Sequence, residues 1–178
     1  IKKIYTKTRR MEDFFRVVDL PGRDVSTEKI LHVGPRDVHE LLMAWMYGFA
    51  WKNITGIDLY STNPKIKVMN MESMTFPDGE FDSLVMAHTL AYAKDTKKCL
   101  AEVVRVLKPG GRAVFGATFT NSESEWEGNR ISGVEILNIL KGLPVEIYYY
   151  NGKEKINALG ERQTSHIFGI MKFDVAQM

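Results

Sequence analysis

Residues Lys29–Asp58 limit most strongly what this chain can fold into. A short apolar stretch at Lys29–Val33 is broken by a glycine–proline turn, and a second apolar stretch follows at Ile54–Ile57. Between them, apolar residues recur at helical spacing, at Val38, Leu41, Leu42, Trp45 and Met46. A helix between two strands indicates a βαβ unit, with a parallel strand pair and a right-handed crossover.

The strand ends of this unit carry the first candidate binding residues. Gly34 follows the first strand, where a glycine lets the backbone approach a ligand closely and the next helix offers free N–H groups. Asp58 ends the second strand, where a carboxylate can accept hydrogen bonds from both hydroxyls of a ribose. The alternative is that they are only a turn and a strand-end cap. A full G-x-G-x-x-G pattern is absent, which argues against a conventional dinucleotide site.

The composition favours a single globular domain. The chain has 178 residues, of which 44% are hydrophobic and 26% charged. The lack of an apolar run of about 18 residues argues against a membrane span, and a net charge of +2 does not favour nucleic acid. One cysteine, Cys99, excludes an internal disulfide and a cysteine-rich metal site. We expect a cytoplasmic protein with no membrane partner, no nucleic-acid partner and no metal.

Strands and helices continue to alternate along the rest of the chain. Further strands are predicted at Ile66–Met69, Phe81–Met86, Arg112–Thr118, Val145–Tyr150 and Ser165–Phe173. Helices are predicted over about 96–107 and at Ser132–Leu140, and residues 120–130 are expected to form a loop. This order predicts an α/β fold: a doubly wound Rossmann-like sandwich on a mostly parallel seven-stranded sheet, with a C-terminal antiparallel strand pair.

The N-terminal segment predicts a short amphipathic helix. Its apolar residues share one helical face: Met11, Phe14, Phe15 and Val18. The helix either packs on the sheet or lies over the ligand site as a lid, and the sequence leaves both open. Residues 1–10 are basic, which a solvated arm explains better than a phosphate-binding patch.

Three later motifs carry a resemblance to a known family. They are Phe76–Asp82 (FPDGEFD), His88–Asp95 (HTLAYAKD) and Glu102–Gly111 (EVVRVLKPGG). With the βαβ unit they resemble the class I S-adenosylmethionine (SAM)-dependent methyltransferases, in particular the small single-domain ones, over residues 29–118. The H-V-G-P-R form of the first motif, together with G-I-D-L-Y-S at Gly56–Ser61, is similar to a poorly characterised subgroup of that family.

The resemblance implies a site for SAM, with S-adenosylhomocysteine as the product. Gly34 would lie beneath the amino-acid part of SAM, Asp58 would hold the ribose hydroxyls, and Leu59 would pack on the adenine. Asn70 stands where the family often has an aspartate, and its side-chain oxygen could accept from the adenine amino group. Met71 would make a backbone contact beside it.

The first motif departs from the family's usual acidic-x-G-x-G-x-G. His32 replaces the acid that commonly helps to position the methionine ammonium group, and Pro35 removes an N–H group. Arg36 places a large cation where a small residue is usual. It could pair with the SAM carboxylate through a charge-assisted hydrogen bond, or fill the pocket and abolish binding. Both alternatives stay open.

The loop after the fourth strand holds the candidate for catalysis. By the resemblance, Ala87 and His88 would face the methyl group and the acceptor. His88 is the candidate base, because a neutral imidazole can accept a proton near pH 7, although it could also serve only to orient the loop. Tyr92 is expected to pack over the ligand, while His39 and His166 are expected to be structural.

Three hypotheses follow for function. We expect one domain over residues 1–178, with an N-terminal arm at 1–24, a SAM-binding core at 29–118 and a substrate-side region at 119–178. The first hypothesis is a SAM-dependent methyltransferase acting on a small molecule, such as a sugar or other hydroxyl compound, with a homodimer left open. The second is a methyltransferase-like binding or scaffold protein without catalysis.

The third hypothesis, a nicotinamide-dependent dehydrogenase, fits the acid at position 58 but not the glycine pattern. Trp126 and the run Tyr148–Tyr150 could line an acceptor pocket, but alternating strand residues more often pack half-buried against neighbours.

Overall fold

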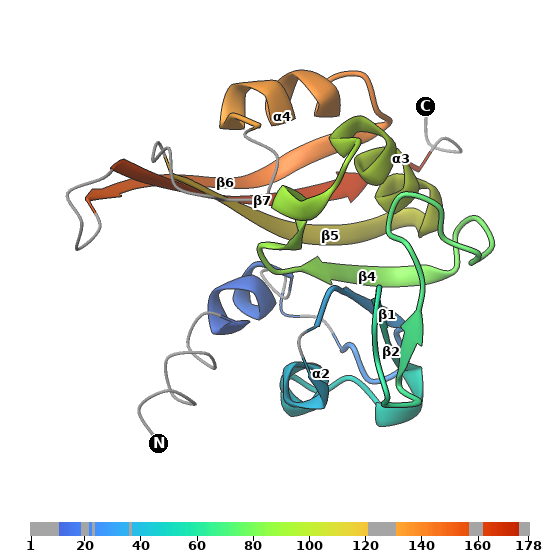
Figure 1. Ribbon diagram of the computed structural model, residues 1–178. Helices are drawn as coiled ribbons and strands as arrows, with labels where there is room; N and C mark the ends of the chain where they lie inside the picture. Colours follow the sequence, from blue (N-terminus) through green and yellow to red (C-terminus); the bar gives the residue numbers. More distant parts are fainter. Residues whose placement is uncertain are drawn as a thin grey trace.

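A seven-stranded sheet forms the centre of the computed structural model, which describes residues 11–18, 22, 24–35, 37–120, 131–156 and 162–174 (Figure 1). The strands are β1 (Ile30–Val33), β2 (Ile54–Asp58), β3 (Ile66–Val68), β4 (Phe81–Met86), β5 (Leu107–Thr120), β6 (Val145–Ile156) and β7 (Arg162–Lys172). They lie in the order β3-β2-β1-β4-β5-β7-β6. The first five strands run parallel to one another, and β7 is antiparallel to both β5 and β6. The predicted fold class is confirmed.

Helices cover both faces of the sheet. They are α2 (Val38–Met46), α3 (Thr96–Val106) and α4 (Gly133–Leu140), with short 3-10 turns η1 (Trp51–Asn53) and η2 (Thr89–Tyr92); residues 11–18 are also helical. The buried hydrophobic residues of α3 and α4 belong to one core cluster, and those of α2 and helix 11–18 belong to another. Figure 1 draws the first two helices toward the top and the other two toward the bottom. None of the helices in these described ranges is long and apolar enough to cross a membrane.

Local side chains explain where α2, α3 and α4 begin. The Asp37 carboxylate accepts a hydrogen bond from the His39 amide at 2.9 Å, so it caps α2. Asp95 caps α3 in the same way, through the Lys98 amide at 2.9 Å. Ser132 and Glu135 form a reciprocal capping box at the start of α4.

Helix 11–18 packs on the sheet. Its four predicted apolar residues are all buried, in one cluster with Val85 of β4 and Val114 of β5. A Cβ atom added to Gly116 of β5 would fall 2.6 Å from the Phe14 ring, so the helix approaches the strand closely. The packing alternative therefore holds, although the same helix also adjoins His88, as shown below.

Three features differ from the sequence-based expectation. Helix α2 forms where predicted, but Leu42, Trp45 and Met46 remain exposed while Met43 and Ala44 are buried. Strand β5 starts at Leu107 and not at the predicted Arg112, because residues 108–111 form an irregularity within its pairing with β4.

Strands β6 and β7 are also longer than predicted. They pair through Ile156 and Arg162, because the polar residues at 151–156 can still form a backbone ladder. The expected loop at 120–130 lies outside the described residues apart from its first residue, as do the basic segment 1–10 and Trp126.

Candidate functional site

The turn after β1 is built around Gly34. Its φ of +69° is left-handed, and its amide donates to the Ile57 carbonyl at 2.8 Å. A Cβ atom here would fall 2.3–2.8 Å from three side-chain atoms of Thr89. Both the conformation and the contact require glycine, so the turn touches the start of η2 directly.

Pro35 has a packing role that offsets its missing N–H group. The residue is buried, and its ring lies so close to β2 that a Cβ atom on Gly56 would fall 3.1 Å from Pro35 Cγ. Because Gly56 has no side chain, the Pro35 ring can pack directly against β2, and this contact fixes the position of the turn relative to that strand.

His32 is a buried polar residue immediately before this turn. It is 2% exposed, and neither of its ring nitrogens has a hydrogen-bond partner among the described residues. Its ring stacks near Phe15 of helix 11–18, with centroids 6.1 Å apart. Burial lowers the pKa of His32 to about 4, so the imidazole is neutral at physiological pH. A buried polar group without a partner is uncommon and costly, and it often marks a functional position.

The end of β2 presents an acid beside exposed apolar side chains. Asp58 is half-buried, and its carboxylate accepts from the Tyr60 amide at 3.3 Å. A carboxylate has about four lone-pair sites, so most of its acceptor capacity is unused by this bond. Leu59 and Tyr60 are 74% and 79% exposed. An acid flanked by exposed apolar groups suits a ligand with a hydroxylated part and a flat apolar part.

The segment after β3 lies beside the end of β2. Asp58 pairs with Val68, and its carbonyl accepts from the Met69 amide at 2.9 Å. Asn70 is exposed, and its side-chain oxygen accepts from the Glu72 amide at 2.9 Å. That oxygen can accept a second hydrogen bond. The predicted ribose-side and adenine-side residues are therefore neighbours, at adjacent strand ends.

The loop after β4 holds His88 in an unusual backbone conformation. Its φ of 60° makes it the one non-glycine residue with positive φ among the described residues. Its ring meets the edge of Phe14, with centroids 5.4 Å apart. Left-handed non-glycine residues carry strain and tend to occur at functional sites. Ala87 precedes it and is half-buried, while Tyr92 is exposed, as a residue that packs over a ligand would be.

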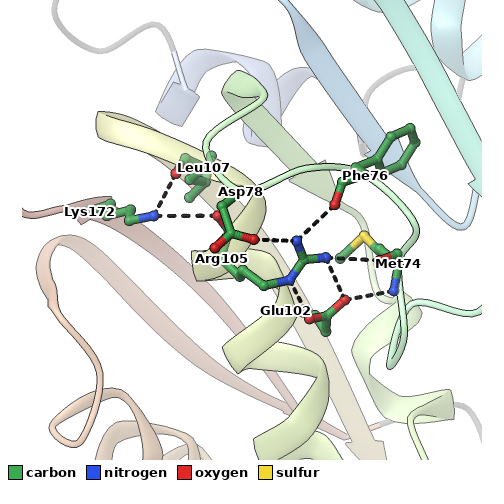
Figure 2. Close-up of polar contacts among 7 residues, drawn as sticks. All are labelled: Met74, Phe76, Asp78, Glu102, Arg105, Leu107 and Lys172. Carbon is green, nitrogen blue, oxygen red and sulfur yellow. Dashed lines mark hydrogen bonds and ion pairs between the residues drawn. The ribbon is translucent and has the colours of Figure 1, made fainter.

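A polar network holds the segment between β3 and β4 against α3 (Figure 2). Arg105 donates to the carboxylates of Glu102 and Asp78, at 2.6 and 2.7 Å, and to the carbonyls of Met74 and Phe76, both at 2.8 Å. Glu102 also accepts from the Met74 amide at 2.6 Å. The hydrogen bond between the two side chains lowers the pKa of Glu102 and raises the pKa of Arg105. These residues therefore hold the segment between β3 and β4 in place.

The network extends to β7 through Lys172, whose ammonium donates to the Leu107 carbonyl at 2.7 Å and to the Arg105 carbonyl at 3.4 Å (Figure 2). It therefore also holds the end of α3. The motifs at Phe76–Asp82 and Glu102–Gly111 carried the family resemblance, but their bonding to each other was not predicted from the sequence. An acid and an arginine three residues apart on a predicted helix were the available signal.

The remaining candidate residues are two histidines, Tyr148 and Arg36. His39 is exposed and lies 3.3 Å from Asp37. His166 is buried, accepts from or donates to the Tyr150 hydroxyl at 3.0 Å, and has its pKa lowered by burial. The Tyr148 hydroxyl donates to the Val17 carbonyl at 3.1 Å, a packing contact with helix 11–18. Arg36 lies outside the described residues.

Comparison with known proteins shows similarity to methyltransferases. Residues 31–115 match the family described as "Methyltransferase domain". The chain is 31% identical over 131 residues to the ubiquinone/menaquinone biosynthesis C-methyltransferase UbiE of Geobacter sulfurreducens, covering 62% of this chain and 50% of the relative. It is 43% identical over 63 residues to the corresponding enzyme of a Marinomonas species, covering 35% and 25%. The chain thus spans half or less of the length of these curated relatives.

Solved structures share the fold at low sequence identity. A geranyl diphosphate C-methyltransferase from Streptomyces coelicolor, in complex with Mg²⁺, geranyl diphosphate and S-adenosylhomocysteine, superposes with a TM-score of 0.74 at 14% identity, covering 93% of this chain and 80% of that one. A SAM-dependent methyltransferase from Methanosarcina mazei superposes with a TM-score of 0.63 at 20% identity, covering 83% and 93%.

Proposed function

We propose that the chain is a class I SAM-dependent methyltransferase, which binds SAM at the ends of β1, β2 and β4 and transfers the methyl group to a small-molecule acceptor. The observation that supports this most is Asp58. Among the described residues, its carboxylate accepts one hydrogen bond, from the Tyr60 amide at 3.3 Å, and exposed Leu59 stands beside it. This is the arrangement that a ribose and an adenine ring require.

The residues present fit the nucleoside half of SAM. Asp58 would accept from the two ribose hydroxyls, Leu59 would cover one side of the adenine, and Asn70 would accept from its amino group. Asn70 retains one acceptor position after its bond to the Glu72 amide. Met71 packs partly against the core, so its backbone is held next to Asn70.

Fewer groups are available to contact the methionine half of SAM. His32 supplies one donor and one acceptor, because its ring is neutral, and both ring nitrogens lack a protein partner within the described ranges. Gly34 permits a close approach of the backbone, but Thr89 occupies the space next to it. When bound, SAM supplies an electrophilic methyl group on a sulfonium. The chain's task is then to align the acceptor and exclude water.

His88 is the proposed base for a hydroxyl acceptor. Its position after β4 and its strained backbone support this role. The relatives are named as C-methyltransferases, and one structural neighbour was solved with geranyl diphosphate. These names support a small-molecule acceptor. A hydroxyl compound such as a sugar, a homodimer, a cytoplasmic location and the single-domain division at 1–24, 29–118 and 119–178 stay predictions.

A second candidate function is a methyltransferase-like binding protein without catalysis. The close contact of Thr89 with Gly34 favours it, because it narrows the methionine half of the site. The two functions differ in whether SAM binds and whether its methyl group is transferred.

Thermal melting with ligands separates the two functions. SAM and S-adenosylhomocysteine should each raise the melting temperature of the protein, whereas NAD should not. Asp58→Asn should remove the shift in melting temperature. The amide is neutral and has one acceptor oxygen, so it cannot make the two charge-assisted bonds that the carboxylate would make to the ribose hydroxyls. No shift with either sulfur compound would contradict the proposal.

The role of His88 is tested by turnover. With labelled SAM and a panel of small hydroxyl compounds, His88→Ala should lower kcat by about 10²-fold or more while SAM affinity stays within a few-fold. His39→Ala is the matched control, since His39 is exposed on α2. Unchanged turnover in His88→Ala would exclude the histidine as base.

A further inference from the structure

The segment after β3 folds back on itself in a tight turn. The Asn70 side-chain oxygen accepts from the Glu72 amide at 2.9 Å, and the Asn70 carbonyl accepts from the Ser73 amide at 3.2 Å. This turn fixes the backbone that carries the proposed adenine contacts. It also fixes the point from which the Glu72 side chain departs.

Glu72 then reaches a different loop. Its carboxylate oxygen Oε1 accepts hydrogen bonds from the backbone amides of Lys94 and, at 3.2 Å, Asp95. These two amides close the loop that follows β4, which contains Ala87 and His88. Glu72 therefore joins two segments more than 20 residues apart in the chain.

The loop that Glu72 holds runs directly into α3. Asp95 is the N-cap of that helix and accepts from the Lys98 amide at 2.9 Å. A carboxylate that accepts from backbone amides at a helix start makes charge-assisted bonds, which are stronger than neutral ones. Glu72 thus fixes where the acceptor-side loop ends.

The other end of the same segment is anchored independently. Met74 and Phe76 are held by Glu102 and Arg105, as Figure 2 shows. Since residues 74–78 are already fixed to α3, a change at Asn70 can be passed on most directly through Glu72. Apolar packing of Leu90 and Ala93 in the same core supports the contact but lacks its directionality.

We propose that Glu72 is a positioning residue that couples the nucleoside side of the site to the loop bearing His88. This rests on the proposed function, because the ligand that binds at Asn70 is taken to be SAM. A ligand that orders the turn at Asn70 stabilises the bonds of Glu72 to Lys94 and Asp95. The acceptor-side loop is thereby ordered when the cofactor is in place, and the coupling acts equally in both directions.

Amide-resolved hydrogen exchange tests the coupling in the full chain. The variants are Glu72→Ala, which removes the acceptor, and Glu72→Gln, which keeps an acceptor oxygen. Glu135→Ala is the matched control, because the Glu135 carboxylate also accepts from a backbone amide at a helix start, that of Ser132 at 2.7 Å. Each is measured with and without S-adenosylhomocysteine.

Without ligand, the amides of Lys94 and Asp95 should exchange about tenfold faster in Glu72→Ala than in the unmodified chain. Glu72→Gln should restore most of the protection, and Glu135→Ala should leave these amides unchanged. With S-adenosylhomocysteine, the unmodified chain should show slower exchange both at 70–73 and at 87–95, by about tenfold in the second region. In Glu72→Ala the ligand should protect 70–73 alone.

Equal ligand protection of 87–95 in Glu72→Ala and the unmodified chain would overturn the coupling while leaving the proposed function intact. Protection confined to 70–73 in the unmodified chain would do the same. No ligand protection anywhere in the unmodified chain would overturn the proposed function, and this inference with it. Unchanged Lys94 and Asp95 exchange in ligand-free Glu72→Ala would show that Glu72 does not hold the loop.

Discussion

The polar groups around Arg105 and those around the turn after β1 differ in how far their hydrogen-bonding capacity is used. Around Arg105, the guanidinium donates to the carboxylates of Glu102 and Asp78 and to the backbone carbonyls of Met74 and Phe76. Around the turn after β1, His32 is buried without a partner in the described part of the chain, and His88 has a left-handed backbone. Satisfied networks stabilise a fold, whereas unpaired and strained groups leave capacity for a ligand. The residues that stabilise the fold around α3 are therefore different from the residues available to bind a ligand.

Among the variants that test this difference, Gly34→Ala should lower the stability of the protein the most. A left-handed alanine costs about 1–2 kcal/mol, and overlap with Thr89 adds about 1–3 kcal/mol. We therefore expect the free energy of unfolding to fall by about 4 kcal/mol, measured by urea denaturation. Gly110→Ala is the matched control, because Gly110 has a similar φ of +73° but nothing within 4 Å of the added Cβ. It should cost only the conformational part.

A double variant sharpens this result. Adding Thr89→Ala to Gly34→Ala removes the two nearest side-chain atoms, so part of the loss should be recovered. Equal losses for Gly34→Ala and Gly110→Ala would show that the contact between the turn and η2 is loose.

Arg105→Ala should follow in size. It leaves the half-buried Glu102 carboxylate without its main partner and frees two backbone carbonyls. Because Arg105 is 29% exposed, we expect a loss near the lower end for a buried pair, about 3 kcal/mol. Lys29→Ala, which breaks an exposed ion pair with Glu80 at 3.6 Å, should cost less than about 1 kcal/mol. Similar losses in both variants would remove the structural role given to the network.

The pH dependence of stability should report His32. The unfolded chain binds a proton at this side chain near its ordinary pKa of 6.5, but the folded protein does so only near 4. Stability is therefore complete above pH 6.5 and falls as the pH drops toward 4, by about 2 kcal/mol between pH 8 and pH 5. His32→Leu should flatten this part of the profile. A slope that is unchanged in His32→Leu would place the titration elsewhere, for example at His166, whose pKa burial also lowers.

The regular framework could be predicted from local sequence patterns. Strand β4 occupies the predicted Phe81–Met86, because an apolar run of that length between turn signals favours a buried strand over a helix. Asp37 and Asp95 were recognisable as caps for the same local reason. The class of fold followed from the order of these elements.

The finer arrangement depended on contacts that no local pattern contains. The bonds of Arg105 reach residues 27 to 31 positions away, and Glu72 reaches residues 22 and 23 positions away. The isolation of His32 arises because helix 11–18 covers it, which a periodicity argument cannot show. The exposure of Trp45 depends on which side of α2 meets the sheet. Burial and long-range pairing, rather than propensity, decided these features.

Binding of SAM by Asp58 and its neighbours can be measured in solution. The experiment is a calorimetric titration with S-adenosylhomocysteine, of the unmodified protein and of Asp58→Asn side by side. We predict a dissociation constant at or below about 100 μM for the unmodified protein, roughly −5.5 kcal/mol, and at least tenfold weaker binding for the variant. The absence of binding heat in the unmodified protein, or equal affinity in the variant, would contradict the proposed binding.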